Sequence, residues 1–181
     1  MASVQNGAQN HLIRIIWHGP FKVDDVRSGN NEYANKFGLY QIYGDHIVSG
    51  HGTLLYIGRT GSKDEVRTFK TRLEEHYKLW LNYINETSVY LGIISDEDWL
   101  PDSDSKNGVT ETLKIAETFS IWWHSPPYNS HHLNDFYLGD LTGVHIQNWK
   151  NPGRLSLEYS WPWKTPLGLM PKSQNKVTEI D

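Results

Sequence analysis

The sequence predicts a mixed α/β fold of the α+β type, in which a small antiparallel β-sheet is flanked by helices. Two β-rich segments, residues 37–44 and 53–60, follow one another closely, and a third spans residues 88–94. Two segments with apolar residues at helical spacing, 64–84 and 109–124, lie on either side of the third strand. This order of hairpin, helix, strand and helix indicates a mixed fold, because each helix has a sheet face to pack against.

The residue types predict the elements of the N-terminal part of the chain. Residues 12–17, LIRIIW, predict a short strand that ends at His18-Gly19-Pro20. Residues 18–36 are rich in turn-forming residues and are expected to be irregular. FGLYQIYG and TLLYIGRT then form the hairpin, with a long loop at residues 45–52. The residue types of this loop assign it no role.

The first helix carries the clearest periodic signal. Asp64 is a suitable N-cap, and the apolar residues that follow are separated by three or four positions, as on one face of an α-helix. These residues are Val66, Phe69, Leu73, Tyr77, Trp80, Leu81 and Ile84.

The second half of the chain is predicted in the same way. Residues 95–108 form an acidic loop, and the helix at 109–124 ends before Pro126 and Pro127. A C-terminal hairpin is expected from 144–149 and 154–160, which flank Asn151-Pro152-Gly153. We therefore divide the chain into an N-terminal extension (1–36), a core (37–129) and a C-terminal extension (130–181) that ends in a polar tail.

Composition excludes several classes of protein. The chain of 181 residues has no cysteine, so disulfide frameworks and cysteine-based metal sites are excluded. No secretory signal opens the sequence and no stretch of about 20 apolar residues occurs, so we expect a cytoplasmic protein without a membrane span. The formal net charge of −4 argues against a protein that only coats nucleic acid, but a nuclease with local basic patches remains compatible with it.

Four kinds of polar residue are placed along these elements. Arg72 and His76 are four positions apart and therefore share one stripe of the first helix. Glu117 lies at the margin of the apolar face of the second helix, where a carboxylate is costly unless it is paired or bound to a metal. The hairpin supplies Tyr40 and Tyr56, which lie two positions from Gly38 and Gly58 respectively.

These residues resemble the GIY-YIG nuclease family over residues 37–129. Gly38-Leu39-Tyr40 stands at the first motif and Tyr56-Ile57-Gly58 at the second. Arg72 corresponds to the family's helix arginine, and His76 to a histidine found in part of the family. Glu117 and Asn129 correspond to the glutamate of the second helix and the asparagine that closes the motif. The chain departs from the pattern in a longer loop between the two motifs and a long stretch between Tyr56 and Arg72.

The resemblance implies hydrolysis of phosphodiesters with one divalent metal, Mg²⁺ or Mn²⁺. Glu117 would be the metal ligand, and Arg72 would hold a phosphate oxygen. Tyr40 would be the general base, although a free tyrosine with a pKa of about 10 needs help from neighbours at neutral pH. His76 and Arg59 are the candidates for that help. Tyr56 would bind phosphate or orient the water, and Asn129 would order the end of the motif.

The short flanks favour a compact enzyme that recognises its DNA sequence without a separate DNA-binding domain. In this it resembles the type II restriction endonucleases of the family. A double-strand cut at a symmetric site then suggests a C₂ homodimer acting on double-stranded DNA. Candidates for DNA contact are Lys63 and four residues of the C-terminal hairpin: Asn148, Lys150, Asn151 and Arg154.

Other interpretations remain open at this point. The chain could be a structure-specific, repair or homing-type nuclease of the same family, or a DNA-binding protein that keeps the fold without activity. His124, His131, His132 and His145 invite a metal-site interpretation, but their spacing matches no established zinc pattern. The paired tryptophans, Trp122-Trp123 and Trp161-Pro162-Trp163, are better explained by packing than by base stacking.

Overall fold

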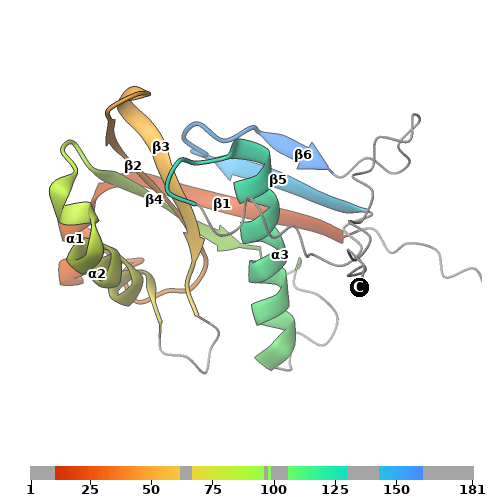
Figure 1. Ribbon diagram of the computed structural model, residues 1–181. Coiled ribbons are helices and arrows are strands. Elements are labelled where there is room, and N and C mark those ends of the chain that lie inside the picture. Colours follow the sequence, from red (N-terminus) through yellow and green to blue (C-terminus); the bar gives the residue numbers. More distant parts are fainter. Residues whose placement is uncertain (1–10, 62–66, 96–97, 99–105, 130–142, 161–181) are drawn as a thin grey trace, which may run out of the picture.

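A computed structural model describes residues 11–61, 67–95, 98, 106–129 and 143–160 of the chain. Within these ranges the protein is a curled six-stranded sheet with three α-helices (Figure 1). The elements are β1 (His11–Lys22), α1 (Val23–Ser28), β2 (Leu39–His46), β3 (Gly50–Arg59), α2 (Phe69–Leu79), the 3₁₀ turn η1 (Leu81–Tyr83), β4 (Ser88–Ile94), α3 (Lys106–His124), β5 (Val144–Lys150) and β6 (Glu158–Ser160).

The sheet has the strand order β3-β2-β4-β1-β5-β6 and is mixed rather than purely antiparallel. β1 and β5 run parallel, with Ile13 opposite Ile146, while every other neighbouring pair is antiparallel. The mixed α+β class therefore agrees with the prediction, but the sheet is larger than expected and one of its five pairs of neighbouring strands is parallel. Alternate apolar residues of both strands, such as Ile13 and Ile146, are buried on one face of the sheet. The sheet therefore extends beyond the central hairpin.

Two hydrophobic clusters cover opposite faces of the sheet. On one face α3 packs through Phe119 onto residues of β1, β3 and β5. On the other face α1 and α2 pack through Val26, Phe69 and Leu73 onto β2 and β4. Neighbouring residues of β2, Leu39 and Tyr40, fall into different clusters, as the pleat of a strand requires. Figure 1 shows the result: β3 runs between α2 and α3.

The N-terminal region is more regular than its turn-rich sequence suggested. β1 continues through Gly19-Pro20 to Lys22, with a shift of register between His18 and Phe21. α1 follows at once, although residues 18–36 were expected to be irregular. Val23 and Val26 are buried at helical spacing, and Asp24 and Asp25 favour the positive end of the helix dipole. Six residues are too few for this pattern to stand out from the sequence.

The first predicted helix is shorter at both ends. α2 begins at Phe69, whose N–H donates to the carbonyl of Lys36, while Lys70 N–H donates to the carbonyl of Ala34. Backbone from a distant segment therefore satisfies the helix start, which sequence spacing could not reveal. The proposed N-cap, Asp64, lies outside the described residues. The helix ends at Leu79, and Leu81 belongs to a separate 3₁₀ turn.

The remaining elements agree closely with expectation. β4 spans the predicted residues 88–94, and α3 contains the predicted helix but begins at Lys106. The central hairpin and the C-terminal hairpin both form, the first with a shorter connection at residues 47–49. β1 and β5, which fall in the predicted extensions, join the same sheet as the core. No helix in the described part of the chain is long and apolar enough to cross a membrane.

Candidate active site

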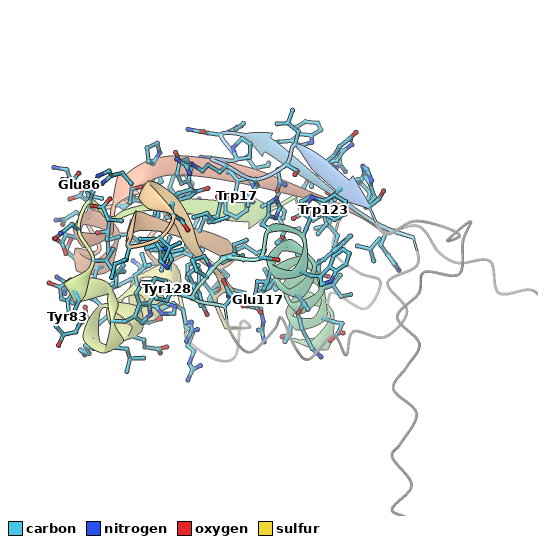
Figure 2. All side chains as sticks on the ribbon, turned by 45° about the horizontal axis from the view of Figure 1, so that its top comes forward. Trp17, Tyr83, Glu86, Glu117, Trp123 and Tyr128 are labelled. Atoms are coloured by element: carbon cyan, nitrogen blue, oxygen red, sulfur yellow. The ribbon has the colours of Figure 1, made fainter. Side chains whose placement is uncertain are left out.

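A small open cavity lies at the C-terminal end of β3. Because β3 is an edge strand, side chains from α2 on one face and α3 on the other meet around it. The cavity has a volume of about 210 Å³, and Figure 2 shows Glu117 between α2 and α3. Its lining consists of Tyr56, Arg59, Thr60, Gly61, Arg67, Arg72 and Glu117.

The two motif glycines are required by close contacts. A Cβ at Gly38 would collide with the backbone carbonyl oxygen of Gly92 on β4. Gly58 is paired directly with Tyr40 across the hairpin, and a Cβ there would lie 2.5 Å from the Tyr40 hydroxyl oxygen and 2.6 Å from Tyr56 Cε1. The ring of Tyr40 therefore lies over a strand position where only glycine leaves room.

Tyr40 is completely buried and does not line the cavity. Its hydroxyl oxygen lies 2.7 Å from His76 Nε2, and its ring packs at 6.0 Å from the ring of Tyr56. Burial raises the pKa of Tyr40 well above its usual value, and the charge of Arg72 opposes this. The hydroxyl thus reaches the cavity only through its neighbours, which differs from the direct contact with water expected of a general base.

Tyr56 occupies the position between Tyr40 and the cavity. Burial raises its pKa, and so does the nearby carboxylate of Glu117, while Arg72 and the hydroxyl of Tyr40 act in the opposite direction. Arg72 therefore interacts with both tyrosines. Burial opposes its charge, but interactions with Tyr40 and Glu75 raise the pKa of Arg72, so the guanidinium remains charged. The guanidinium of Arg72 thus lies close to the phenol groups of both Tyr40 and Tyr56.

His76 lies beneath the tyrosine pair and is 7% exposed. Its Nδ1 accepts a hydrogen bond from the indole N–H of Trp80 at 3.1 Å, while its Nε2 faces Tyr40. Burial, followed by the charge of Arg72, lowers the pKa of His76 to about 4. The imidazole is therefore neutral at pH 7.

Glu117 and Arg59 form the opposite wall. Glu117 Oε1 accepts the backbone N–H of Arg59 at 3.1 Å, and Oε2 accepts Arg59 Nε–H at 2.9 Å. The side chain of Glu117 is 10% exposed, and its ion pair with Arg59 holds the carboxylate at the cavity wall. Arg59 was one candidate for adjusting the pKa of Tyr40. Its guanidinium instead bonds Glu117, whereas His76 and Arg72 lie beside Tyr40.

Asn129 ties the end of this region to β3. Its amide oxygen accepts the N–H of Ile57 at 2.9 Å, and its amide nitrogen donates to the carbonyl of Ile57 at 2.7 Å. Both bonds are buried, so the side chain acts as a short extra strand along the edge of β3. This geometry orders the segment after α3 and leaves no polar group of Asn129 directed at the cavity.

The residues suggested for DNA contact have different surroundings. Asn148 is buried, accepts the indole N–H of Trp17 at 2.8 Å and donates to the carbonyl of Ser156 at 2.7 Å. Its suggested role in reading bases is wrong for this conformation, because both ends of the amide are already engaged.

The neighbouring candidates are more accessible. Lys150, Asn151 and Arg154 are exposed, although the Asn151 amide donates to the carbonyl of Gly19 at 2.8 Å. Lys63 lies outside the described residues.

Three contributors were not predicted as site residues. Arg67 lines the cavity, and Glu75 pairs with both Arg67 and Arg72, which restrains the two cations. Trp80 holds His76. The spacing of four residues between His76 and Trp80 is typical of side chains that meet on one helix face, and it could have indicated this contact.

The metal-binding groups of the cavity fit a metal ion that keeps most of its bound water molecules. Among the described residues, Glu117 is the only carboxylate in the cavity lining, and no group of three or more His, Asp or Glu side chains could hold a metal. A single carboxylate suits Mg²⁺, which commonly binds one or two carboxylates together with water and phosphate oxygens. His124 is not available as a ligand, because Nδ1 bonds the carbonyl of Ser120 and Nε2 accepts the N–H of Ser156.

Comparisons with known proteins added no relative. A scan of family models, a search of curated proteins and a search of solved structures each gave no match.

Proposed function

We propose that the protein is a divalent-metal-dependent endonuclease that hydrolyses phosphodiester bonds in double-stranded DNA, of the GIY-YIG type and acting as a type II restriction enzyme. One observation carries the proposal. Residues from four separate segments, carrying the polar groups that such a reaction needs, converge on one cavity at the end of β3. They are Tyr56, Arg59, Arg72 and Glu117 in the lining, with Tyr40 and His76 directly behind.

The charges of this cavity suit a phosphodiester. Among the described residues of the lining, Arg59, Arg67 and Arg72 supply three guanidinium groups and Glu117 supplies one carboxylate. Because Glu117 is engaged by Arg59 and Glu75 by Arg67 and Arg72, the cations are held in place before a substrate arrives. Fixed donors of this kind stabilise charge that develops on phosphate oxygens without further reorganisation.

The tyrosine pair supplies a path for the proton of the attacking water. Tyr56, which lines the cavity, would take this proton and pass its own to the phenolate of Tyr40 behind it. The charge of Arg72 favours that phenolate. Tyr40 is then the base, acting through Tyr56, which reconciles its assigned role with its burial. General base catalysis of this kind contributes about 10²–10⁴-fold.

Glu117 would hold the metal ion with one of its carboxylate oxygens. When bound, Mg²⁺ or Mn²⁺ supplies positive charge to the transferred phosphate and the leaving oxygen. The role of Arg59 is to position Glu117 through its backbone N–H and its guanidinium.

The specificity of a restriction enzyme requires contacts outside this cavity. Lys150 at the end of β5 and Arg154 on the β5–β6 connection are exposed and are candidates for phosphate or base contacts. The tip of the central hairpin presents Ile47 and Val48 almost fully to solvent, and it is a second candidate for contact with DNA or with another copy of the chain. A C₂ dimer would place two active sites on the two strands of a symmetric site.

The test is digestion of a sequenced plasmid in Mg²⁺, followed by sequencing of the ends. We expect discrete fragments whose ends share one short symmetric sequence, and a dimer in sedimentation equilibrium. Random ends, or cuts only at branched DNA, would replace the restriction function by a nonspecific or structure-specific nuclease. Binding of DNA without any cleavage across many sequences would leave an inactive DNA-binding protein of the same fold.

A further inference from the structure

Both ring nitrogens of His76 have a hydrogen-bonding partner. Trp80 Nε1 lies 3.1 Å from Nδ1, and the hydroxyl oxygen of Tyr40 lies 2.7 Å from Nε2. Turning the ring over would replace both nitrogens by carbons at these contacts. The two partners together therefore define the ring orientation.

The Trp80 contact determines which nitrogen carries the proton. An indole N–H can only donate a hydrogen bond, so His76 Nδ1 must accept and cannot itself be protonated. The ring is neutral at pH 7, because burial and then the charge of Arg72 lower the pKa of His76 to about 4. A neutral imidazole without a proton on Nδ1 carries it on Nε2.

We propose that Trp80 is a positioning residue that holds His76 in the Nε2–H tautomer, so that His76 donates a hydrogen bond to the oxygen of Tyr40. This is the opposite of an arrangement in which His76 accepts the Tyr40 proton. A donor directed at the phenol oxygen favours the phenolate over the neutral phenol. The value of this donor for the reaction rests on the proposed function; the tautomer itself does not.

The position of Trp80 in the fold supports this role. Trp80 follows directly after α2, where its backbone N–H donates to the carbonyl of His76 at 2.9 Å. Its ring packs against Tyr56 at 6.2 Å and Tyr128 at 4.9 Å. Trp80 therefore makes two hydrogen bonds to one residue, with the indole held between aromatic neighbours. Phenylalanine would keep the packing and the backbone bond but lose the N–H donor.

The groups around Tyr40 come from three elements. Tyr56 faces it from β3, Arg72 and His76 from α2, and the carboxylate of Glu117 acts on it from α3. Arg72 is a cation and cannot change its role as a donor. His76 is the one partner of the Tyr40 hydroxyl whose direction of donation depends on a tautomer, which makes the Trp80 contact decisive.

The experiment is a long-range ¹H–¹⁵N correlation spectrum of the full chain labelled in its histidine rings, at pH 7 and without DNA or metal. His76→Gln identifies the His76 signals by their loss. We expect a protonated Nε2 and an unprotonated Nδ1 in the wild type, and a shift toward the Nδ1–H form in Trp80→Phe. Trp123→Phe is the matched control, since it removes an indole donor that bonds Ser156 at 3.2 Å and should leave the His76 signals unchanged.

Two results would overturn the inference: a protonated Nδ1 in the wild type, or an unchanged tautomer in a folded Trp80→Phe variant. The wild-type spectrum alone is decisive if that variant does not fold. In a cleavage assay, Trp80→Phe should be slower by about tenfold, the equivalent of one hydrogen bond, and Trp123→Phe should not. If no variant and no wild-type protein cleaves DNA while the spectra are as expected, the proposed function fails and the Trp80–His76–Tyr40 arrangement stands.

Discussion

Replacing His76 by glutamine should remove a defined part of the pH dependence of stability. The pKa of His76 is lowered from 6.5 in the unfolded chain to about 4 in the fold, because burial and Arg72 disfavour the imidazolium. Between these values the unfolded chain binds a proton that the folded chain does not. The contribution of His76 to the free energy of unfolding is therefore fully present above pH 6.5. It is lost as the pH falls toward 4.

The magnitude follows from the size of the pKa change. At about 1.4 kcal/mol for each pKa unit, His76 should cost the fold about 2 kcal/mol by pH 5 and about 3 kcal/mol at pH 4. The side chain is 7% exposed, so little of this effect is lost to solvent screening. Glutamine can still accept from Trp80 and donate to Tyr40, and it does not titrate.

The assay is urea unfolding of both proteins at several pH values between 7 and 4. The difference in unfolding free energy between wild type and His76→Gln should change by about 3 kcal/mol across this range, in favour of the variant at low pH. His51→Gln is the control for loss of a histidine, since its side chain is 91% exposed. Parallel curves for wild type and His76→Gln would refute the reasoning about burial of the neutral ring.

The other predictions concern the tyrosine pair and the edge of β3. Tyr40→Phe and Tyr56→Phe should each slow DNA cleavage by about 10²–10⁴-fold without loss of the far-UV circular dichroism spectrum, and wild-type activity in either variant would remove that tyrosine from the proton path. Burial raises the pKa of both tyrosines, so the cleavage rate should rise about tenfold per pH unit from pH 7 to 9, and a flat profile would contradict a phenolate base. Gly58→Ala should destabilise the fold by about 1–3 kcal/mol in urea unfolding, because its Cβ would lie 2.5 Å from the Tyr40 hydroxyl; unchanged stability would show that the ring can move aside. Asn129→Ala should cost about 2–4 kcal/mol, since both backbone groups of Ile57 lose a buried partner, and a loss below 1 kcal/mol would mean that water replaces the amide.

Much of the core could be predicted from the sequence because its signals are local. β4 matched its predicted residues, and the pairing of β2 with β3 follows from two β-rich segments close together in the chain. Helical spacing also accounts for Arg72 and His76 sharing one stripe of α2, whereas the approach of Glu117 to this hairpin depends on how α3 packs on the opposite face of the sheet.

Other features depend on contacts between distant segments. The start of α2 is set by the carbonyl groups of Ala34 and Lys36, and the parallel pairing of β1 with β5 joins residues more than a hundred positions apart. The burial of Asn148 depends on Trp17, across the same pair of strands. No local pattern carries this information, so the hairpin turn made Asn148 look like a surface residue.

The burial of Tyr40 is the most informative difference for function. A tyrosine beside a motif glycine gives no sign of which of two neighbouring hydroxyl groups faces the cavity. The alternation of side chains along β2 and β3 places Tyr40 and Tyr56 on one face, but the position of α2 above them decides which is covered. A mechanism in which Tyr40 acts through Tyr56 is the consequence.

The central claim is tested most directly by one comparison of cleavage rates on DNA with and without Mg²⁺. The comparison uses wild type, Glu117→Gln and Glu111→Gln, because Glu111 lies on the same helix with a side chain that is 52% exposed. We predict metal-dependent cleavage by wild type and Glu111→Gln, and a loss of at least about 10²-fold in Glu117→Gln, the order expected when one group that stabilises developing charge is removed. Cleavage by Glu117→Gln at the wild-type rate, or cleavage by wild type that persists in EDTA, would contradict the account.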